Sequence, residues 1–144
     1  MAATEQIGVD LVPLARISAI VDRGEQEVFL RRILSDEEMA WCAGHREPQL
    51  AAAACLATKE AVIKLLGGRP SGFHWSDVAL ADVPPDGGPA ALGPLRDALE
   101  GVGVSSVEVH RCCLRRTAVS TGADEVWSMW GRLDGDVIAV TTWS

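Results

Sequence analysis

"LATKEAVIKLLGG", Leu56–Gly68, ends a long segment that predicts a helix beginning near Pro48. Alanine and leucine, both strong helix formers, dominate this segment, "EPQLAAAACLATKEAVIKLLGG". Pro48 suits a first helical turn, and the pair Gly67-Gly68 suits a C-terminal cap. One face of the helix carries small apolar side chains that would let another element approach closely. This stripe consists of Ala54, Thr58, Ala61, Val62 and Leu65.

Three charged residues of the same helix form a candidate site. Glu60 and Lys64 are four residues apart and therefore neighbours on one helical face. Lys59 precedes Glu60 and lies about 100° away around the helix axis. One interpretation is an exposed ion pair worth about 0.2–0.5 kcal/mol. The other is a carboxylate that holds Mg²⁺ while the flanking lysines meet the oxygens of a diphosphate. The residues alone leave both interpretations open.

The first strand carries a second acidic candidate. "IGVDLV", Ile7–Val12, is apolar except for Asp10, and a carboxylate is costly to bury without a partner. Asp10 therefore either caps the helix predicted from Pro13 to Gly24 or ligates a metal. Two further helices are expected, and the second begins at a capping box formed by Ser35 and Glu38.

The remainder of the chain changes to strand patterns. "SDVALADV" and Val104–Leu114 predict strands, and a helix ends at a glycine between them. "EVWSMWG" and "DVIAVTTW" predict a hairpin that turns at Asp134-Gly135. This order predicts an α+β fold in which an antiparallel sheet packs against helices. With 144 residues, the chain is expected to form one domain over residues 1–144.

Composition narrows the function further. The net charge of −7 disfavours non-specific nucleic-acid binding. The opening residues predict no secretory signal, and no apolar run is long enough to cross a bilayer, so no membrane partner is expected. The cysteines show no CxxC pair, which favours free, buried thiols in a reducing cytoplasm. They are Cys42, Cys55, Cys112 and Cys113.

Four ordered segments resemble the holo-acyl-carrier-protein synthases, the short phosphopantetheinyl transferases. They are "IGVDLVPLARI", "FLRRILSDEEMAWC", "LATKEAVIKLLGG" and "WSDVAL". The resemblance covers roughly the first 80 residues and implies a 4'-phosphopantetheinyl transferase-like fold. It also implies the transfer of 4'-phosphopantetheine from coenzyme A to a serine of an apo-acyl carrier protein, as in fatty acid or polyketide biosynthesis, with 3',5'-ADP as by-product. Short members of this family are usually homotrimers with sites at subunit interfaces.

The resemblance also implies roles for individual residues. Asp10 and Glu60 would be the Mg²⁺ ligands, and Lys64 would contact the diphosphate of coenzyme A. Lys59 occupies a position where the family also has lysine and would assist in binding coenzyme A. Arg16 matches the arginine that receives the acidic carrier protein. Either Glu60 or a metal-bound water would accept the serine proton.

The second half departs from the family pattern. The family carries a serine- and histidine-containing motif that helps to bind coenzyme A, and "GVSSVEVHRCCL" does not match it position for position. His110 is the candidate that would replace the family histidine, and Arg115–Arg132 is interpreted as an insertion. Two hypotheses follow: an active transferase with an altered coenzyme A pocket, or a divergent member of the fold. The divergent member would bind a carrier protein or its acyl chain without this chemistry, or catalyse another reaction.

Overall fold

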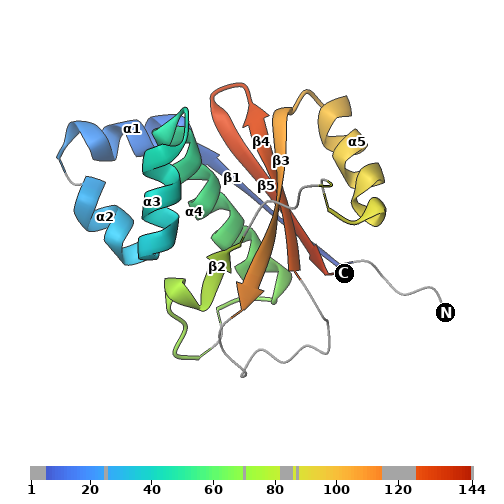
Figure 1. Cartoon of the computed structure of the whole chain (residues 1–144), viewed down its shortest axis with the longest axis horizontal. Helices are drawn as coiled ribbons and strands as arrows, with labels where there is room; N and C mark the ends of the chain where they lie inside the picture. The colour runs from blue at the N-terminus through green and yellow to red at the C-terminus, as the bar shows by residue number, and fades with distance from the viewer. Residues whose placement is uncertain are drawn as a thin grey trace.

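The structure is a computed structural model that describes residues 6–143, except for residues 25, 70, 82–85, 87 and 115–125. The helices lie mainly in the first half of the chain and most strands in the second half (Figure 1). The chain begins with a strand, continues with four helices, and returns to strands in its second half. The elements are β1 (Ile7–Pro13), α1 (Leu14–Asp22), α2 (Gln26–Ile33), α3 (Asp36–Gly44), α4 (Pro48–Leu65), the 3₁₀ turn η1 (Trp75–Asp77), β2 (Val78–Leu80), the 3₁₀ turn η2 (Ala90–Leu92), α5 (Gly93–Gly101), β3 (Ser105–Leu114), β4 (Val126–Leu133) and β5 (Asp136–Trp143).

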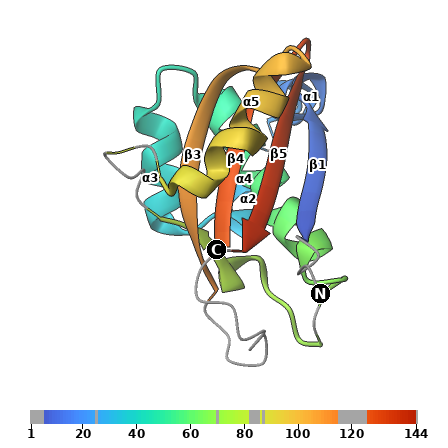
Figure 2. The same ribbon diagram turned by 90° about the vertical axis from the view of Figure 1, so that its right-hand side faces the viewer.

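The strands form one sheet in the order β1-β5-β4-β3-β2, with every neighbouring pair antiparallel. Helix α4 crosses one face and packs against β1 and β5, while α5 lies on the opposite face against β3 (Figure 2). Helices α1 and α3 pack beside α4. The predicted α+β class, with an antiparallel sheet packed against helices, is confirmed. The prediction of one domain over residues 1–144 stays a prediction.

The predicted hairpin at the end of the chain is confirmed, and it corrects another expectation. Strands β4 and β5 pair from Val126↔Trp143 to Leu133↔Asp136, and Asp134 adopts a left-handed φ of 53° in the turn. Strand β4 is the middle strand of the sheet. The interpretation of Arg115–Arg132 as an insertion is therefore wrong for residues 126–132, whereas residues 115–125 lie outside the described part of the chain.

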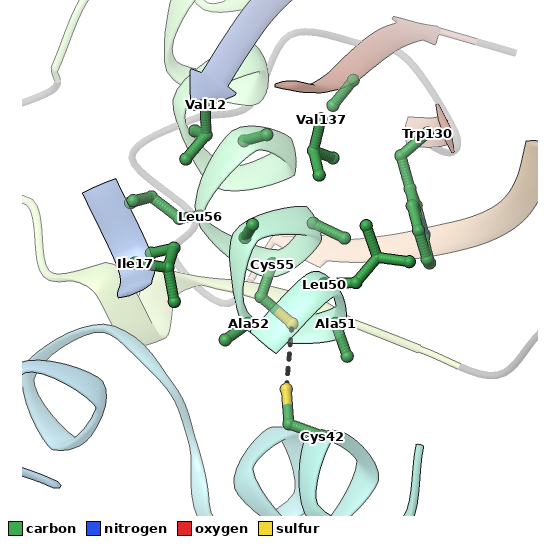
Figure 3. Close-up of a cluster of buried hydrophobic side chains, with 14 of the residues drawn as sticks. Val12, Ile17, Cys42, Leu50, Ala51, Ala52, Cys55, Leu56, Trp130 and Val137 are labelled. Carbon is green, nitrogen blue, oxygen red and sulfur yellow. Dashed lines mark hydrogen bonds between the residues drawn. The ribbon is translucent and has the colours of Figure 1, made fainter. Parts of the chain in front are cut away.

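Helix α4 is the centre of the core. Its predicted apolar stripe is buried along its whole length, and α3 packs against it. Figure 3 shows the thiols of Cys42 and Cys55 facing each other between α3 and α4, with Sγ atoms 3.9 Å apart. Free, buried thiols are confirmed for Cys42, Cys55 and Cys112, but Cys113 is exposed because adjacent strand residues face opposite sides of the sheet.

Candidate functional site

The contact between β1 and α4 builds the candidate site. Gly8, Asp10 and Val12 alternate along β1 and face α4. A Cβ atom added to Gly8 would overlap the carbonyl oxygen of Ala61 and lie 2.9 Å from the Leu65 nitrogen. Glycine on the strand and alanine on the helix thus let the two backbones approach closely. This close approach brings Asp10, two residues beyond Gly8, to the charged face of α4.

Asp10 and Glu60 form an acidic pair at this contact. Asp10 is only 8% exposed, and its Oδ1 accepts a hydrogen bond of 2.6 Å from Lys64 Nζ. Among the described residues, no group donates to its buried Oδ2 while Glu60 is ionised, and a protonated Glu60 would donate a hydrogen bond to this carboxyl. Burial raises the pKa of Glu60, and the adjoining Asp10 carboxyl raises it further, while Arg16 and Lys64 act in the opposite direction. The structure therefore brings together the two acids that sit 50 residues apart in sequence.

The acidic pair fits a divalent cation. Carboxylate oxygens are the ligands that Mg²⁺ prefers, and Mg²⁺ is commonly held by one or two carboxylates together with water and substrate phosphates. A buried, unpartnered oxygen on Asp10 next to a second carboxyl is the donor arrangement that such an ion satisfies. Over the part of the chain that the structure describes, no group of three or more histidine, cysteine or acidic residues could hold a metal. Further ligands would accordingly come from solvent or from a bound phosphate.

Two cationic side chains border the acidic pair. The Lys64 side chain is 58% exposed. Its ammonium is bonded to Asp10 and is also accessible to a ligand that arrives from solvent. Arg16, on α1, is exposed and lies close enough to Glu60 to lower the pKa of that carboxyl. The pair of acids thus has a positive rim, which suits an anionic ligand that arrives with a metal ion.

Lys59 lies elsewhere. Its side chain is fully buried, and its ammonium donates to Glu38 Oε1 at 2.8 Å, to the Ile33 carbonyl at 2.8 Å and to the Trp75 carbonyl at 3.1 Å. An ammonium has three donors, and these three acceptors use all of them. The predicted contact of Lys59 with coenzyme A disagrees with this placement, because the ammonium faces the interior on another side of α4.

His110 is also absent from the acidic pair. It lies on β3, which β5 and β4 separate from β1, and its side chain is 2% exposed. The ring stacks on Trp130 and meets the edge of Trp41, while Nδ1 lies 3.3 Å from the Ala81 carbonyl. Burial lowers the pKa of His110. The prediction that His110 binds coenzyme A is not supported by this enclosed position.

The sequence of this chain matches a known protein family over most of its length. The family described as 4'-phosphopantetheinyl transferase superfamily (ACPS) matches residues 6–112, which is more than half of the chain. The chain belongs to the 4'-phosphopantetheinyl transferase superfamily. The match begins just before β1 and includes both acids of the pair and the whole of α4.

Curated relatives of this superfamily match about half of the chain. A holo-[acyl-carrier-protein] synthase of Myxococcus xanthus is 38% identical over 72 residues, which are 50% of this chain and 56% of the relative. The corresponding protein of Pelodictyon phaeoclathratiforme is 45% identical over 78 residues, 52% of this chain and 62% of the relative. The chain thus spans less than two thirds of the length of these relatives.

Solved structures of the superfamily share the fold over nearly the whole chain. Helicobacter pylori holo-[acyl-carrier-protein] synthase in complex with coenzyme A gives a TM-score of 0.68 at 23% identity, covering 96% of this chain and 99% of that chain. The holo-ACP-synthase of Plasmodium yoelii gives 0.64 at 16% identity, covering 96% and 92%. At these identities the likeness supports the phosphopantetheinyl transferase fold.

Two residues that shape the site are not among the candidates that the sequence predicts. Gly8 sets the approach of β1 to α4, and its signal was a lone glycine inside a strand pattern, which often marks a close backbone approach. Glu38 was identified only as part of a capping box, which it does form, but it also receives Lys59. Nothing local in the sequence indicated that second partner.

Proposed function

We propose that this protein transfers 4'-phosphopantetheine from coenzyme A to a serine of an apo-acyl carrier protein in a Mg²⁺-dependent reaction. The observation that carries the proposal is the convergence of Asp10 and Glu60, with a buried, unpartnered Asp10 oxygen and a rim formed by Lys64 and Arg16. Membership in the superfamily and the names of the relatives support it.

In this mechanism Asp10 and Glu60 hold the metal, which supplies neutralisation of the diphosphate charge when it is bound. Lys64 donates hydrogen bonds to the diphosphate oxygens, since its exposed stem can turn from Asp10 toward a ligand. The serine oxygen of the carrier attacks the phosphorus that bears the pantetheine arm, the serine proton passes to Glu60 or to a water, and the bond to 3',5'-ADP breaks. The chain itself provides no nucleophile; its residues position the reactants and stabilise charge.

The partners follow from charge and exposure. Carrier proteins are acidic and this chain has a net charge of −7, so attraction requires a local basic surface, for which we propose Arg16 beside the acidic pair. Edge strand β1 exposes Ile7, Val9 and Leu11 by 52%, 38% and 46% on its outer face. We propose that this apolar face takes part in assembly of a homotrimer.

We further propose a cytoplasmic location, because all four cysteines are free thiols and three of them are buried. Over the described residues, no helix is long and apolar enough to cross a membrane.

A direct transfer experiment tests the activity. The protein is incubated with Mg²⁺, coenzyme A and an apo-carrier protein, and the carrier is weighed by mass spectrometry. The expected result is a gain of one phosphopantetheine, and chelation of the metal should prevent it. If no apo-carrier gains mass and coenzyme A does not bind, a non-catalytic protein that binds a carrier or its acyl chain becomes the better explanation.

Variants of the acidic pair test the metal assignment. Asp10→Asn and Glu60→Gln should each abolish transfer while circular dichroism shows an intact fold, because each removes a charged metal ligand. Glu100→Gln is the matched control, since Glu100 is an exposed glutamate on α5, on the opposite side of the sheet. Full activity in both site variants would show that the two acids do not hold the metal.

A further inference from the structure

A second carboxylate–lysine pair lies on α4, on the side away from Asp10. Glu38 is 4% exposed and Lys59 is fully buried, and their charged atoms are 2.8 Å apart. Burying two charges is costly unless hydrogen bonds satisfy the remaining donors and acceptors. Here the Lys59 ammonium donates its other two hydrogen bonds to the carbonyls of Ile33 and Trp75. Such a pair has a specific geometry as well as an attraction.

The Glu38 side of the pair is equally well bonded. Oε1 also accepts from the Ser35 backbone nitrogen at 2.8 Å, and Oε2 accepts from the Leu80 nitrogen at 3.1 Å. The pair therefore joins α4 to the end of α2, the start of α3, η1 and β2. Lys59 itself bonds to three of these segments, and Glu38 adds the contact with β2.

The Glu38–Lys59 ion pair, called the anchor below, also affects the direction of the Glu60 side chain. Consecutive residues of an α-helix point about 100° apart around the axis, so fixing Lys59 also fixes the direction of Glu60. Lys64 shares the face of Glu60 and turns with it. The approach of Gly8 to Ala61 determines how close β1 and α4 lie. The direction in which Glu60 and Lys64 leave the helix depends on the rotation of α4 about its axis, and Lys59 holds the helix on another side.

We propose that Glu38 and Lys59 are positioning residues, whose buried ion pair sets the rotation of α4 and so holds Glu60 and Lys64 against Asp10. Neither residue touches a reactant; each acts through the helix. This inference rests on the proposed function, because it assigns the ion pair a task for the same metal-binding acids.

The test compares a double variant with wild type. Glu38→Gln combined with Lys59→Met removes both buried charges, so no unpaired charge remains and the net charge of the protein is unchanged. Cys42→Ala is the matched control, because it alters the same α3–α4 interface one turn away without touching the anchor. The readout is the dissociation constant for Mn²⁺ in the presence of coenzyme A, measured by electron paramagnetic resonance below the unfolding transition of every variant.

The folded double variant should bind Mn²⁺ about 10- to 100-fold more weakly than wild type, as is typical when a residue supporting a metal ligand is lost. Cys42→Ala should bind like wild type even where its unfolding temperature falls, since a merely stabilising contact leaves the affinity of the folded protein unchanged. A folded double variant with wild-type affinity overturns the positioning role. A wild-type protein that binds no Mn²⁺ with coenzyme A overturns the proposed function, and the positioning role with it.

If the double variant does not fold, Glu38→Asp replaces it. This change keeps the charge but shortens the side chain by one methylene, so Lys59 must shift to keep its partner. Weaker Mn²⁺ binding by folded Glu38→Asp supports the positioning role, and unchanged binding overturns it.

Discussion

Helix α4 carries two lysine–carboxylate pairs that are nearly equal in length and different in character. Lys64 lies 2.6 Å from Asp10, and Lys59 lies 2.8 Å from Glu38. The Lys64 side chain is 58% exposed and leaves one Asp10 oxygen without a partner, whereas Lys59 is sealed and both Glu38 oxygens are bonded. A short ion pair therefore does not identify a ligand site. The unsatisfied oxygen and the solvent access are the two features that support the proposed metal site at Asp10.

Replacing each lysine by methionine should separate the two pairs most clearly. Lys59→Met leaves the Glu38 carboxylate buried beside an apolar side chain and should lower the free energy of unfolding by about 3–5 kcal/mol. Lys64→Met removes an exposed lysine but leaves the buried Asp10 carboxylate without this hydrogen bond, so it should cost less, about 1–3 kcal/mol. Transfer should nevertheless fall by about 100-fold or more in folded Lys64→Met, because a charged donor to the diphosphate is lost.

Urea denaturation and the transfer assay measure these two effects side by side. The comparison fails if the two variants lose similar stability, or if Lys64→Met transfers as fast as wild type.

Gly8→Ala should weaken the contact between β1 and α4. This contact holds Asp10 beside Glu60 and Lys64, which together are called the open pair below. The new methyl group would meet the backbone of α4 at Ala61 and Leu65, and backbone cannot move aside as a flexible side chain can. We expect a loss of about 1–3 kcal/mol in the free energy of unfolding, the usual cost of an overpacked site. Mn²⁺ affinity should fall as well, because β1 and Asp10 would be displaced from Glu60.

Gly44→Ala is the control for this substitution. A Cβ atom at Gly44 would have no described neighbour within 4 Å, and its φ is not left-handed, so stability and Mn²⁺ affinity should stay close to wild type. A Gly8→Ala protein that matches this control in both measurements would show that the close approach is dispensable.

The family resemblance predicted that Asp10, Glu60 and Lys64 share one site, whereas nothing in the sequence predicted the Lys59–Glu38 pair, and the reason is physical. Helix propensity and the terminal Pro48 made α4 easy to predict, and the motif resemblance placed Asp10 and Glu60 in one site. The partner of Lys59 is 21 residues away on another helix, and no local pattern encodes how two helices face each other. A lysine is also so rarely buried that composition alone favours an exposed position.

The strand half of the molecule shows the same limit. The β4–β5 hairpin could be predicted because Asp134-Gly135 is a local turn signal between two strand patterns. The burial of His110 could not, because alternation along β3 does not tell which face of the strand other elements will cover. Trp41 of α3 and Trp130 of β4 enclose it, and both contacts arise only when the sheet is assembled.

Arg16→Glu tests the positive rim of the open pair. Reversing this exposed charge should raise the KM for the carrier protein by about fivefold, the equivalent of an exposed ion pair of about 1 kcal/mol. The KM for coenzyme A should change less, and the effect should shrink at high salt because exposed charges are screened. Equal changes in both KM values would contradict a role in carrier binding.

The smallest expected effect concerns the pH dependence of stability at the open pair. Burial and the Asp10 carboxyl raise the pKa of Glu60 above its ordinary value of 4.5, so the folded state binds the Glu60 proton more tightly than the unfolded state. Well below pH 4.5 Glu60 is protonated in both states, and the stability contributed by its tighter proton binding in the folded state is fully present. As the pH rises above 4.5 and through the folded-state pKa, Glu60 ionises in both states and this stabilisation is lost, so the free energy of unfolding falls.

Glu60→Gln should therefore match wild type in acid and become slightly more stable than wild type as the pH rises toward neutrality, in urea midpoints measured at each pH. Saturating Mg²⁺ with coenzyme A should reverse the order at neutral pH, because a ligand bound to the folded wild-type protein stabilises it by mass action. Glu100→Gln, the exposed control on α5, loses only a surface ion pair with Arg96, so it should not gain stability as the pH rises and should show no reversal with Mg²⁺. Glu60→Gln could instead be less stable than wild type at neutral pH without metal. That result would show that the Asp10 and Glu60 carboxylates do not destabilise each other, which would contradict a cation site between them.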